Sequence, residues 1–432
     1  MKRSAFLFTL CLLAIARPHP ARAADGAPAG VVVPVVLSLS DALQLALTSN
    51  PRLQALGWEV RIAEGRALQA GARPNPVISA ELENAGGTEP GLSNSETTLS
   101  IGQLLELGGK RSARLGVARA DQSVLALDVR GERFALMGEV TRRYIESLAV
   151  DQSLALTEEE VRSAEEASST TAQRVTAGAA HPVERRRADV ELTNLKLDRT
   201  ILQSDALLAR SRLSLLWGEP QPRFERLSGT LGSLPALPNL DSLSLRAESS
   251  PVLARWRAEQ AARQMRLELE RSRRIPDLTA QAGIRQLSES DGHTFVAGIS
   301  LPVPLFDRNR GAIEQASAAL SQAPSAEAQA RLDVRQSLAE GHASLRRSAV
   351  KLETLRRDVL PEAQRAYEEM RVGFERGRFA YLDLLDARRT WLRAKREELQ
   401  TLLVAHLAVA DLERLLGGPL DANSNPERGL DR

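Results

Sequence analysis

The feature that most constrains the fold of this 432-residue chain is that its sequence repeats itself. Residues 41–80 align without a gap with residues 241–280, a shift of 200 positions. Identical pairs include Asp41/Asp241, Leu43/Leu243, Leu45/Leu245, Ser49/Ser249, Pro51/Pro251, Leu53/Leu253, Glu59/Glu259, Arg66/Arg266, Arg73/Arg273, Pro76/Pro276 and Ala80/Ala280. A tandem duplication predicts two units of similar architecture that share one role.

The two copies also match near their ends, where LLWGEP in the first corresponds to LLGGPL in the second. Within each copy the pattern predicts a helix, two strands, a long helix and a further helix. After an N-terminal leader at 1–23, we expect a first repeat at 24–218, a Pro- and Gly-rich linker at 219–239, a second repeat at 240–418 and a C-terminal tail at 419–432.

The leader has the character of a secretory signal peptide. Two basic residues precede an apolar run, and Ala-Arg-Ala ending at Ala23 fits a small-x-small cleavage site. The single cysteine, Cys11, lies inside this leader and follows Leu10, which is not the small residue of a lipoprotein signal. The mature chain is therefore expected to carry no lipid anchor, disulfide or thiolate metal site.

Charge and composition exclude other classes of protein. Removing the four basic residues of the leader lowers the formal charge from +2 to about −2, so no nucleic-acid partner is expected. Only 3% of the residues are aromatic, which suits long Ala- and Leu-rich helices better than several compact cores. No mature stretch reaches the roughly 18 consecutive apolar residues of a transmembrane helix.

Long helices dominate the pattern. The first is predicted from Ser40, as N-cap, to Ala72. A second, free of proline from 110 to 173, would be about 95 Å long. Its counterpart in the other copy contains Pro324 and Pro361, which should kink or interrupt it.

Four short segments alternate apolar residues with small or polar ones. The clearest are 276–287 and 293–302, and the first copy has matching segments at 78–83 and 98–102. Their lengths approach the roughly 9–11 residues of a tilted membrane strand, although exposed hairpins of a soluble protein would show the same alternation. Four strands cannot close a barrel, and lipid tolerates no open sheet edge, so other copies must supply strands. Three chains would give twelve strands around a water-filled lumen.

These segments resemble the TolC-like outer-membrane efflux channels, and more narrowly their cobalt-zinc-cadmium branch. The resemblance covers nearly the whole mature chain and is carried by four motifs: LSLSDALQLALTSNP (37–51), QLLELGGKR (103–111), LPVPLFDRNRG (301–311) and YLDLLDARR (381–389). It implies a mainly α-helical protein whose duplicated long hairpins form a periplasmic tunnel. Four strands per chain would contribute to a trimeric twelve-stranded membrane β-barrel.

The resemblance also implies a location and partners. The protein is expected in the outer membrane of a Gram-negative bacterium, in contact with outer-membrane lipid and extending into the periplasm. A homotrimer would act as a passive conduit that docks onto a periplasmic adaptor and an inner-membrane RND-type pump. Divalent heavy-metal cations are the expected cargo, with organic drugs as the alternative. A periplasmic coiled-coil scaffold or adaptor without a pore is the rival interpretation.

Two aspartates, Asp383 and Asp386, are the main candidate site residues. They share one face of a helix, and the resemblance places them, with Glu184 of the first copy, at the periplasmic constriction of the channel. Alternatively they form a solvated face paired with Arg389 and Arg393. In this family a tyrosine and an arginine near the second turn commonly form a latch that holds the channel closed. The resemblance places Phe374 at the tyrosine position and Phe379 at the arginine position. It also implies that the turns at Gly178 and Gly377 contact the adaptor.

Four basic residues follow the strands, namely Lys110, Arg111, Arg308 and Arg310, and they are expected at the membrane edge or at helix caps. The segment LGGKRS lacks the first glycine and the hydroxyl residue of a phosphate loop. The mature histidines lie far apart in the sequence, so no metal site, cofactor or enzymatic activity is expected.

Overall fold

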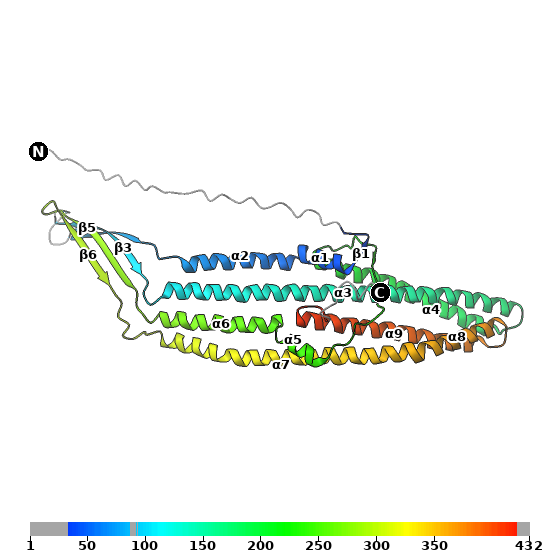
Figure 1. Cartoon of the computed structure of the whole chain (residues 1–432). Coiled ribbons are helices and arrows are strands. Elements are labelled where there is room, and N and C mark those ends of the chain that lie inside the picture. The colour runs from blue at the N-terminus through cyan, green and yellow to red at the C-terminus, as the bar shows by residue number, and fades with distance from the viewer. Residues whose placement is uncertain (1–32, 87–91, 93, 421–432) are drawn as a thin grey trace.

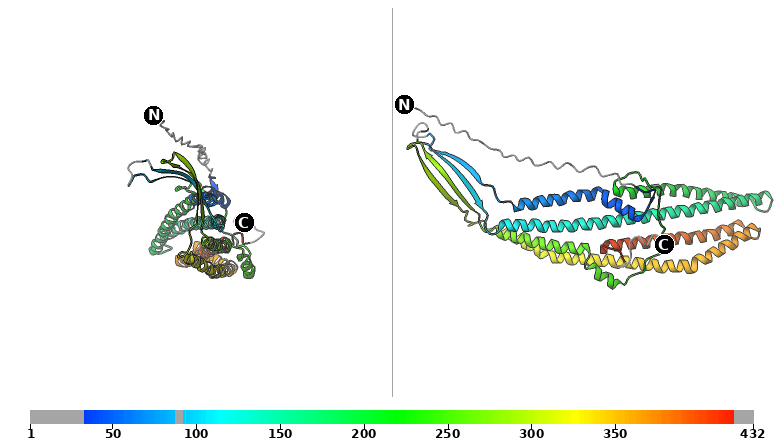
Figure 2. Two further views of the ribbon diagram at one scale, coloured as in Figure 1. Left: turned by 90° about the vertical axis from the view of Figure 1, so that its left-hand side faces the viewer. Right: turned by 45° about the horizontal axis from the view of Figure 1, so that its top comes forward.

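The computed structural model describes residues 33–86, 92 and 94–420. The leader expected at 1–23, with Cys11, and most of the tail expected at 419–432 lie outside these residues. Figure 1 shows a long bundle of helices with a β-sheet at one end. The sheet leans away from the bundle in the views of Figure 2. The molecule is therefore a rod with one β-structured end.

Each copy begins with a helix that is broken by proline. The predicted single helix from Ser40 to Ala72 is wrong, because α1 (Leu39–Ser49) and α2 (Pro51–Gly71) are separate helices. Pro51 has no N–H to continue α1, and the Asn50 side chain caps α2 instead. The N-cap of α1 is Ser38 rather than Ser40.

The second copy breaks at the equivalent proline. Helix α5 (Leu240–Ala247) ends before α6 (Pro251–Ser272), and the Ser250 side chain caps α6. The duplication has therefore kept a proline break together with a side-chain cap, although the capping residue is asparagine in one copy and serine in the other.

The long helices differ in regularity. Helix α3 (Lys110–Thr176) has 67 residues and spans about 100 Å, as predicted. Its counterpart comprises α7 (Arg310–Thr354), the π-helical turn η2 (Leu355–Val359) and α8 (Leu360–Glu375). The wider turn of η2 precedes Pro361 and gives its ring room where a regular helix would clash with the preceding turn. Pro324, by contrast, lies inside α7 without ending it.

Each long helix is followed by a returning helix. Helix α4 (Pro182–Ser214) packs back on α3, and α9 (Tyr381–Leu416) packs on α7, α8 and α3. A short 3₁₀ turn, η1 (Leu215–Trp217), ends the first copy. The two copies thus form two long hairpins that lie side by side through α3 and α9 (Figure 1).

The four predicted strands form one antiparallel sheet in the order β2-β3-β5-β6. Strands β2 (Val77–Glu83) and β3 (Glu96–Leu105) come from the first copy, and β5 (Leu278–Leu287) and β6 (Gly292–Ser300) from the second. Pairing of β3 with β5 joins the copies, with Leu99 opposite Ile284. Among the described residues, strands β2 and β6 each pair with one neighbour only, so both outer edges of the sheet are open there.

A small parallel ladder lies partway along the bundle. Strand β1 (Val36–Leu37) pairs with β4 (Arg226–Leu227), which belongs to the segment expected as a linker. The buried Tyr144 of α3 donates its hydroxyl hydrogen to the carbonyl oxygens of Leu37 and Ser228, at 3.0 and 2.7 Å. Tyr144 therefore fastens the ladder to the long helix.

Buried residues are distributed along the rod rather than gathered in one centre. The largest cluster contains Tyr144, Leu213 and Trp217, and a second, with Leu338 and Leu412, lies between α5, α7 and α9. Within the described part of the chain, none of the helices combines the length and the apolar character needed to cross a bilayer.

Candidate functional site: hairpin tips and strand-to-helix junctions

The two hairpin tips have the same backbone geometry. After α3, Gly178 has a φ of +69°, and the Ala179 N–H donates to the Arg174 carbonyl at 2.8 Å. After α8, Gly377 has a φ of +75°, and the Arg378 N–H donates to the Gly373 carbonyl at 2.8 Å. These are Schellman-type ends in which glycine adopts a left-handed conformation at low cost.

The candidate acids lie directly after these turns. Glu184 is the third residue of α4, and Asp383 is the third residue of α9. The Asp383 carboxylate accepts a hydrogen bond from the Ala380 N–H at 3.1 Å, which caps α9. Asp386 is exposed one turn further on. The structure therefore places Glu184 and Asp383 at equivalent positions of the two hairpins.

Of the two arginines that the alternative interpretation pairs with Asp386, Arg389 has another partner. Arg389 Nη2 lies 2.6 Å from Glu191 Oε2 of α4, and this hydrogen bond raises the pKa of Arg389 above its ordinary value. The pairing joins α9 to α4 rather than neutralising Asp386. Asp383 and Asp386 consequently form an exposed acidic face beside the second tip.

Aromatic residues hold the two tips together. The Arg174 guanidinium of α3 lies 4.7 Å from the ring centroid of Phe374, and its Nη1 donates to the Phe374 carbonyl at 3.0 Å. The rings of Phe374 and Tyr381 meet edge to face at 6.1 Å, and both side chains are buried. Phe379 packs against Gly373. No local pattern in the sequence points to Arg174, because its partner Phe374 is 200 residues away.

Buried charge lies further along α9, beyond Asp386. The Glu160 side chain of α3 is fully buried and pairs with Arg396 of α9. Burial raises the pKa of Glu160 above its ordinary value, although Arg396 and Arg388 oppose the shift. Arg388 is 3% exposed, and its Nε and Nη2 have no hydrogen-bond partner among the described residues. Arg388 and Arg396 both line a cavity of about 540 Å³ between α4 and α9.

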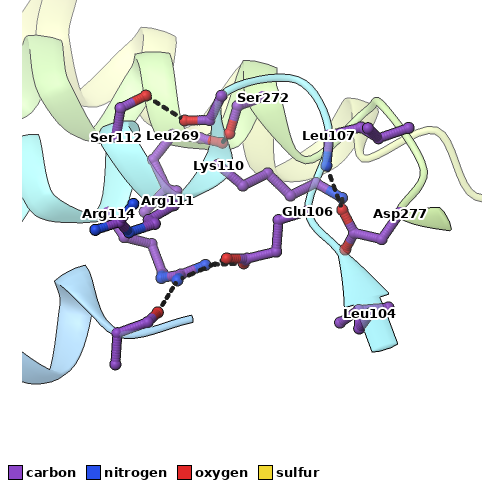
Figure 3. Close-up of polar contacts among 12 residues, drawn as sticks. Leu104, Glu106, Leu107, Lys110, Arg111, Ser112, Arg114, Leu269, Ser272 and Asp277 are labelled. Atoms are coloured by element: carbon purple, nitrogen blue, oxygen red, sulfur yellow. Dashed lines mark hydrogen bonds and ion pairs between the residues drawn. The ribbon is translucent and has the colours of Figure 1, made fainter. Parts of the chain in front are cut away.

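The first strand-to-helix junction is built from ion pairs (Figure 3). Lys110 Nζ lies 2.7 Å from Asp277 Oδ1, which also accepts the Leu107 N–H at 3.1 Å. Glu106 forms an ion pair with Arg114, and hydrogen bonding to Glu106 raises the pKa of Arg114. Because Asp277 precedes β5, the Lys110 contact ties the first copy to the second.

The remaining basic candidates lie on the surface. Arg111 Nε donates to the Gly71 carbonyl at 2.6 Å, and Arg308 Nε donates to the Pro304 carbonyl at 3.3 Å. Arg310 begins α7 and is exposed. Lys110 and Arg111 therefore contact neighbouring elements of the junction, and Lys110 is the most enclosed of the four, with 12% of its side chain exposed.

No group of three or more histidine, cysteine, aspartate or glutamate side chains with the geometry of a metal site occurs within residues 33–86, 92 and 94–420. The acids of the two tips belong to separate helices: Asp383 caps α9, Asp386 is exposed, and Glu184 is half-buried with its Oε2 atom unpaired among the described residues.

Comparison with known proteins agrees with this architecture. The family described as "Outer membrane efflux protein" matches residues 42–219 and 243–418. The cobalt-zinc-cadmium resistance protein CzcC of Cupriavidus metallidurans is 32% identical and covers 88% of this chain and 90% of its own. The nickel and cobalt resistance protein CnrC of the same species is 31% identical over 67% of this chain and 68% of its own.

A solved structure of CusC, from work on its folding and transmembrane channel formation, has a TM-score of 0.74 at 18% identity. It covers 88% of this chain and 92% of its own. The fold and the family match favour an outer-membrane efflux channel over the pore-free periplasmic scaffold. With both copies matched by one family, the chain belongs to the outer membrane efflux proteins.

Proposed function

We propose that this outer-membrane efflux protein is the exit channel for divalent heavy-metal cations. Similarity to CzcC, at 32% identity over 88% of the chain, is the observation that supports this cargo. The channel itself supplies no energy and no chemistry. In this proposal an adaptor and an RND-type pump of the inner membrane deliver the cations to it.

The sheet supports assembly from several copies. Strands β2 and β6 have open edges, and each such edge presents unpaired N–H and C=O groups. In lipid these groups must find partners, and a neighbouring copy offers them edge to edge. Three copies would close twelve strands into a barrel, in which β2 of one chain pairs with β6 of the next.

The hairpin tips support a gate at the opposite end. Three copies would bring Asp383 and Asp386 close to one axis, with Glu184 nearby, where like charges attract cations and repel one another. The turns at Gly178 and Gly377 end the rod, and a Cβ added at either position would meet no atom within 4 Å. These exposed turns are the proposed contact for the adaptor. Outward movement of the helix pair 310–417 would open the gate.

Growth of a deletion strain tests the cargo. The strain would be compared with the complemented strain on graded zinc, cobalt, cadmium and copper and on a panel of organic drugs. Loss of resistance to one or more of the divalent metals, restored by the gene, is the expected result. Sensitivity confined to the organic drugs would replace the metal proposal with the alternative cargo.

A further inference from the structure

We infer that Arg285 and three carboxylates on the same face of the sheet set the ion selectivity of the outer mouth of the pore, independently of the acids at the hairpin tips. This inference rests on the proposed channel function. It concerns the loop end of the sheet, which is the end of the molecule furthest from the hairpin tips (Figure 1).

The strand register places these side chains on one face. Glu81 lies opposite Thr98, Thr98 opposite Arg285, and Arg285 opposite Thr294. Two residues further along, Glu83 lies opposite Glu96, on the same face because side chains alternate along a strand. The next row of paired residues, nearer the loops than Arg285, therefore adds two more carboxylates to the same surface.

The opposite face is apolar and exposed. It carries Ile78, Leu82, Leu99, Ile284 and Phe295, and Phe295 is 90% exposed in the single chain. In a closed membrane sheet the apolar face contacts lipid and the polar face lines the lumen. The face with Arg285 is consequently the lumenal face.

Arg285 connects three strands on that face. Its Nη1 lies 2.7 Å from Glu96 Oε2, its Nη2 lies 3.0 Å from Glu83 Oε2, and its Nε donates to Thr98 Oγ1 at 3.0 Å. The rigid fork of a guanidinium suits such divergent contacts, whereas a lysine ammonium cannot make all of them. One positive charge is thus shared between two carboxylates.

The charge on this face is negative overall. Over the described strand residues it carries the carboxylates of Glu81, Glu83 and Glu96 and the single guanidinium of Arg285. Each chain therefore contributes a charge of about −2, and three chains would form a ring of roughly −6. Such a ring concentrates cations and repels anions in the lumen.

The rest of the lumenal face carries little charge that could compete with this ring for ions. Towards the helices its positions are small or uncharged, among them Ser79, Ser100, Gly102, Gly283 and Gly298. The charge is therefore confined to the two rows of paired residues nearest the loops. A filter at this place would act on ions after they have passed through the helical tunnel.

Reversal potentials in planar bilayers under a KCl gradient test the inference. The variant with Glu81→Gln, Glu83→Gln and Glu96→Gln should lower the ratio of K⁺ to Cl⁻ permeability by roughly threefold or more. Arg285→Gln should raise this ratio, because two carboxylates lose their counter-charge. Arg285→Lys keeps the charge and should leave the ratio near that of the wild type. Heat-resistant trimers on gels would show that each variant is assembled.

The acids at the tips provide the comparison. If Asp383→Asn with Asp386→Asn accounts for all of the selectivity and the triple glutamine variant conducts with an unchanged ratio, the inference is wrong while the channel function stands. A wild-type protein that forms trimers but conducts no ions would overturn the proposed function itself.

Discussion

The two copies keep the same order of elements but build their long hairpins differently. Helix α3 continues for 67 residues, whereas the equivalent stretch of the second copy changes to the π turn η2 before Pro361. Nevertheless both hairpins end in a left-handed glycine followed six residues later by an acid, Glu184 in the first copy and Asp383 in the second. The ends of the hairpins have therefore stayed more alike since the duplication than the long helices between them.

The strand-to-helix junctions show the same contrast. Gly109 and Asn309 are the N-cap residues of α3 and α7, and both have positive φ angles, of +73° and +55°. The first junction has an additional left-handed residue, Gly108, with a φ of +69°. The second has Arg308 at the matching position. One left-handed residue is thus common to both copies, and the second is specific to the first.

Replacement of Gly108 by alanine should have the largest effect. Its Cβ would lie 2.7 Å from Ile275 Cδ1 and 2.8 Å from Ile275 Cβ, in a backbone conformation that alanine disfavours. We expect a loss of about 2–4 kcal/mol in the free energy of unfolding. Thermal melts of the purified trimer, followed by circular dichroism, measure it.

The matched control is Gly109→Asn, which copies the residue of the second junction and should cost less than about 1 kcal/mol. Equal stability of Gly108→Ala and the wild type would show that the extra left-handed residue of the first copy has no structural role.

Acid stability should depend on His406, whose position in the first copy is the buried Ala206. Burial lowers the pKa of His406 from 6.5 to about 4. The unfolded chain takes up a proton at higher pH than the folded chain, so stability is complete above 6.5 and is lost as the pH falls towards 4. This interval corresponds to about 3 kcal/mol.

The variant His406→Leu should lose less stability than the wild type as the pH falls from 6.5 towards 4. Its change in stability at pH 7 should be smaller than this difference. Melting temperatures of both proteins between pH 7.5 and pH 4.5 provide the measurement. Parallel curves for the two proteins would show that other groups control the acid sensitivity.

Replacement of the acids after the two tips should have the smallest effect of the three. In bilayer recordings, Asp383→Ala with Asp386→Ala should weaken blockade by divalent or trivalent cations about tenfold, or roughly 1.4 kcal/mol. Glu184→Ala should have a smaller effect, because one half-buried acid is removed rather than two exposed ones. Glu362→Ala, at an exposed acid of α8, is the control. Unchanged conductance and blockade in the double variant would place the constriction elsewhere.

Sequence reasoning succeeded where the signal is local or periodic. The alternation around Ala80 and Ala280 predicted strands, and the proline-free run after Lys110 predicted the long helix. It failed at Asn50, where the helical periodicity continues across Pro51 although the backbone does not. Of the two prolines expected to kink or interrupt the second long helix, Pro324 lies inside α7 without ending it, whereas Pro361 follows the π turn η2. Whether a single proline interrupts a helix depends on the balance between the lost hydrogen bond and the packing around the proline. A sequence pattern does not contain this balance.

The duplication, the four amphipathic strands, the two long hairpins and the acids after their turns can be read from the sequence, because each depends on spacing along the chain. Three contacts come from the three-dimensional packing alone: β3 pairs with β5, Arg174 contacts Phe374, and Arg285 joins Glu83 to Glu96. These contacts link residues that lie about 200 positions apart. Their partners are selected by the packing of one copy against the other, and a chain of similar, charged helices offers many alternatives with the same spacing.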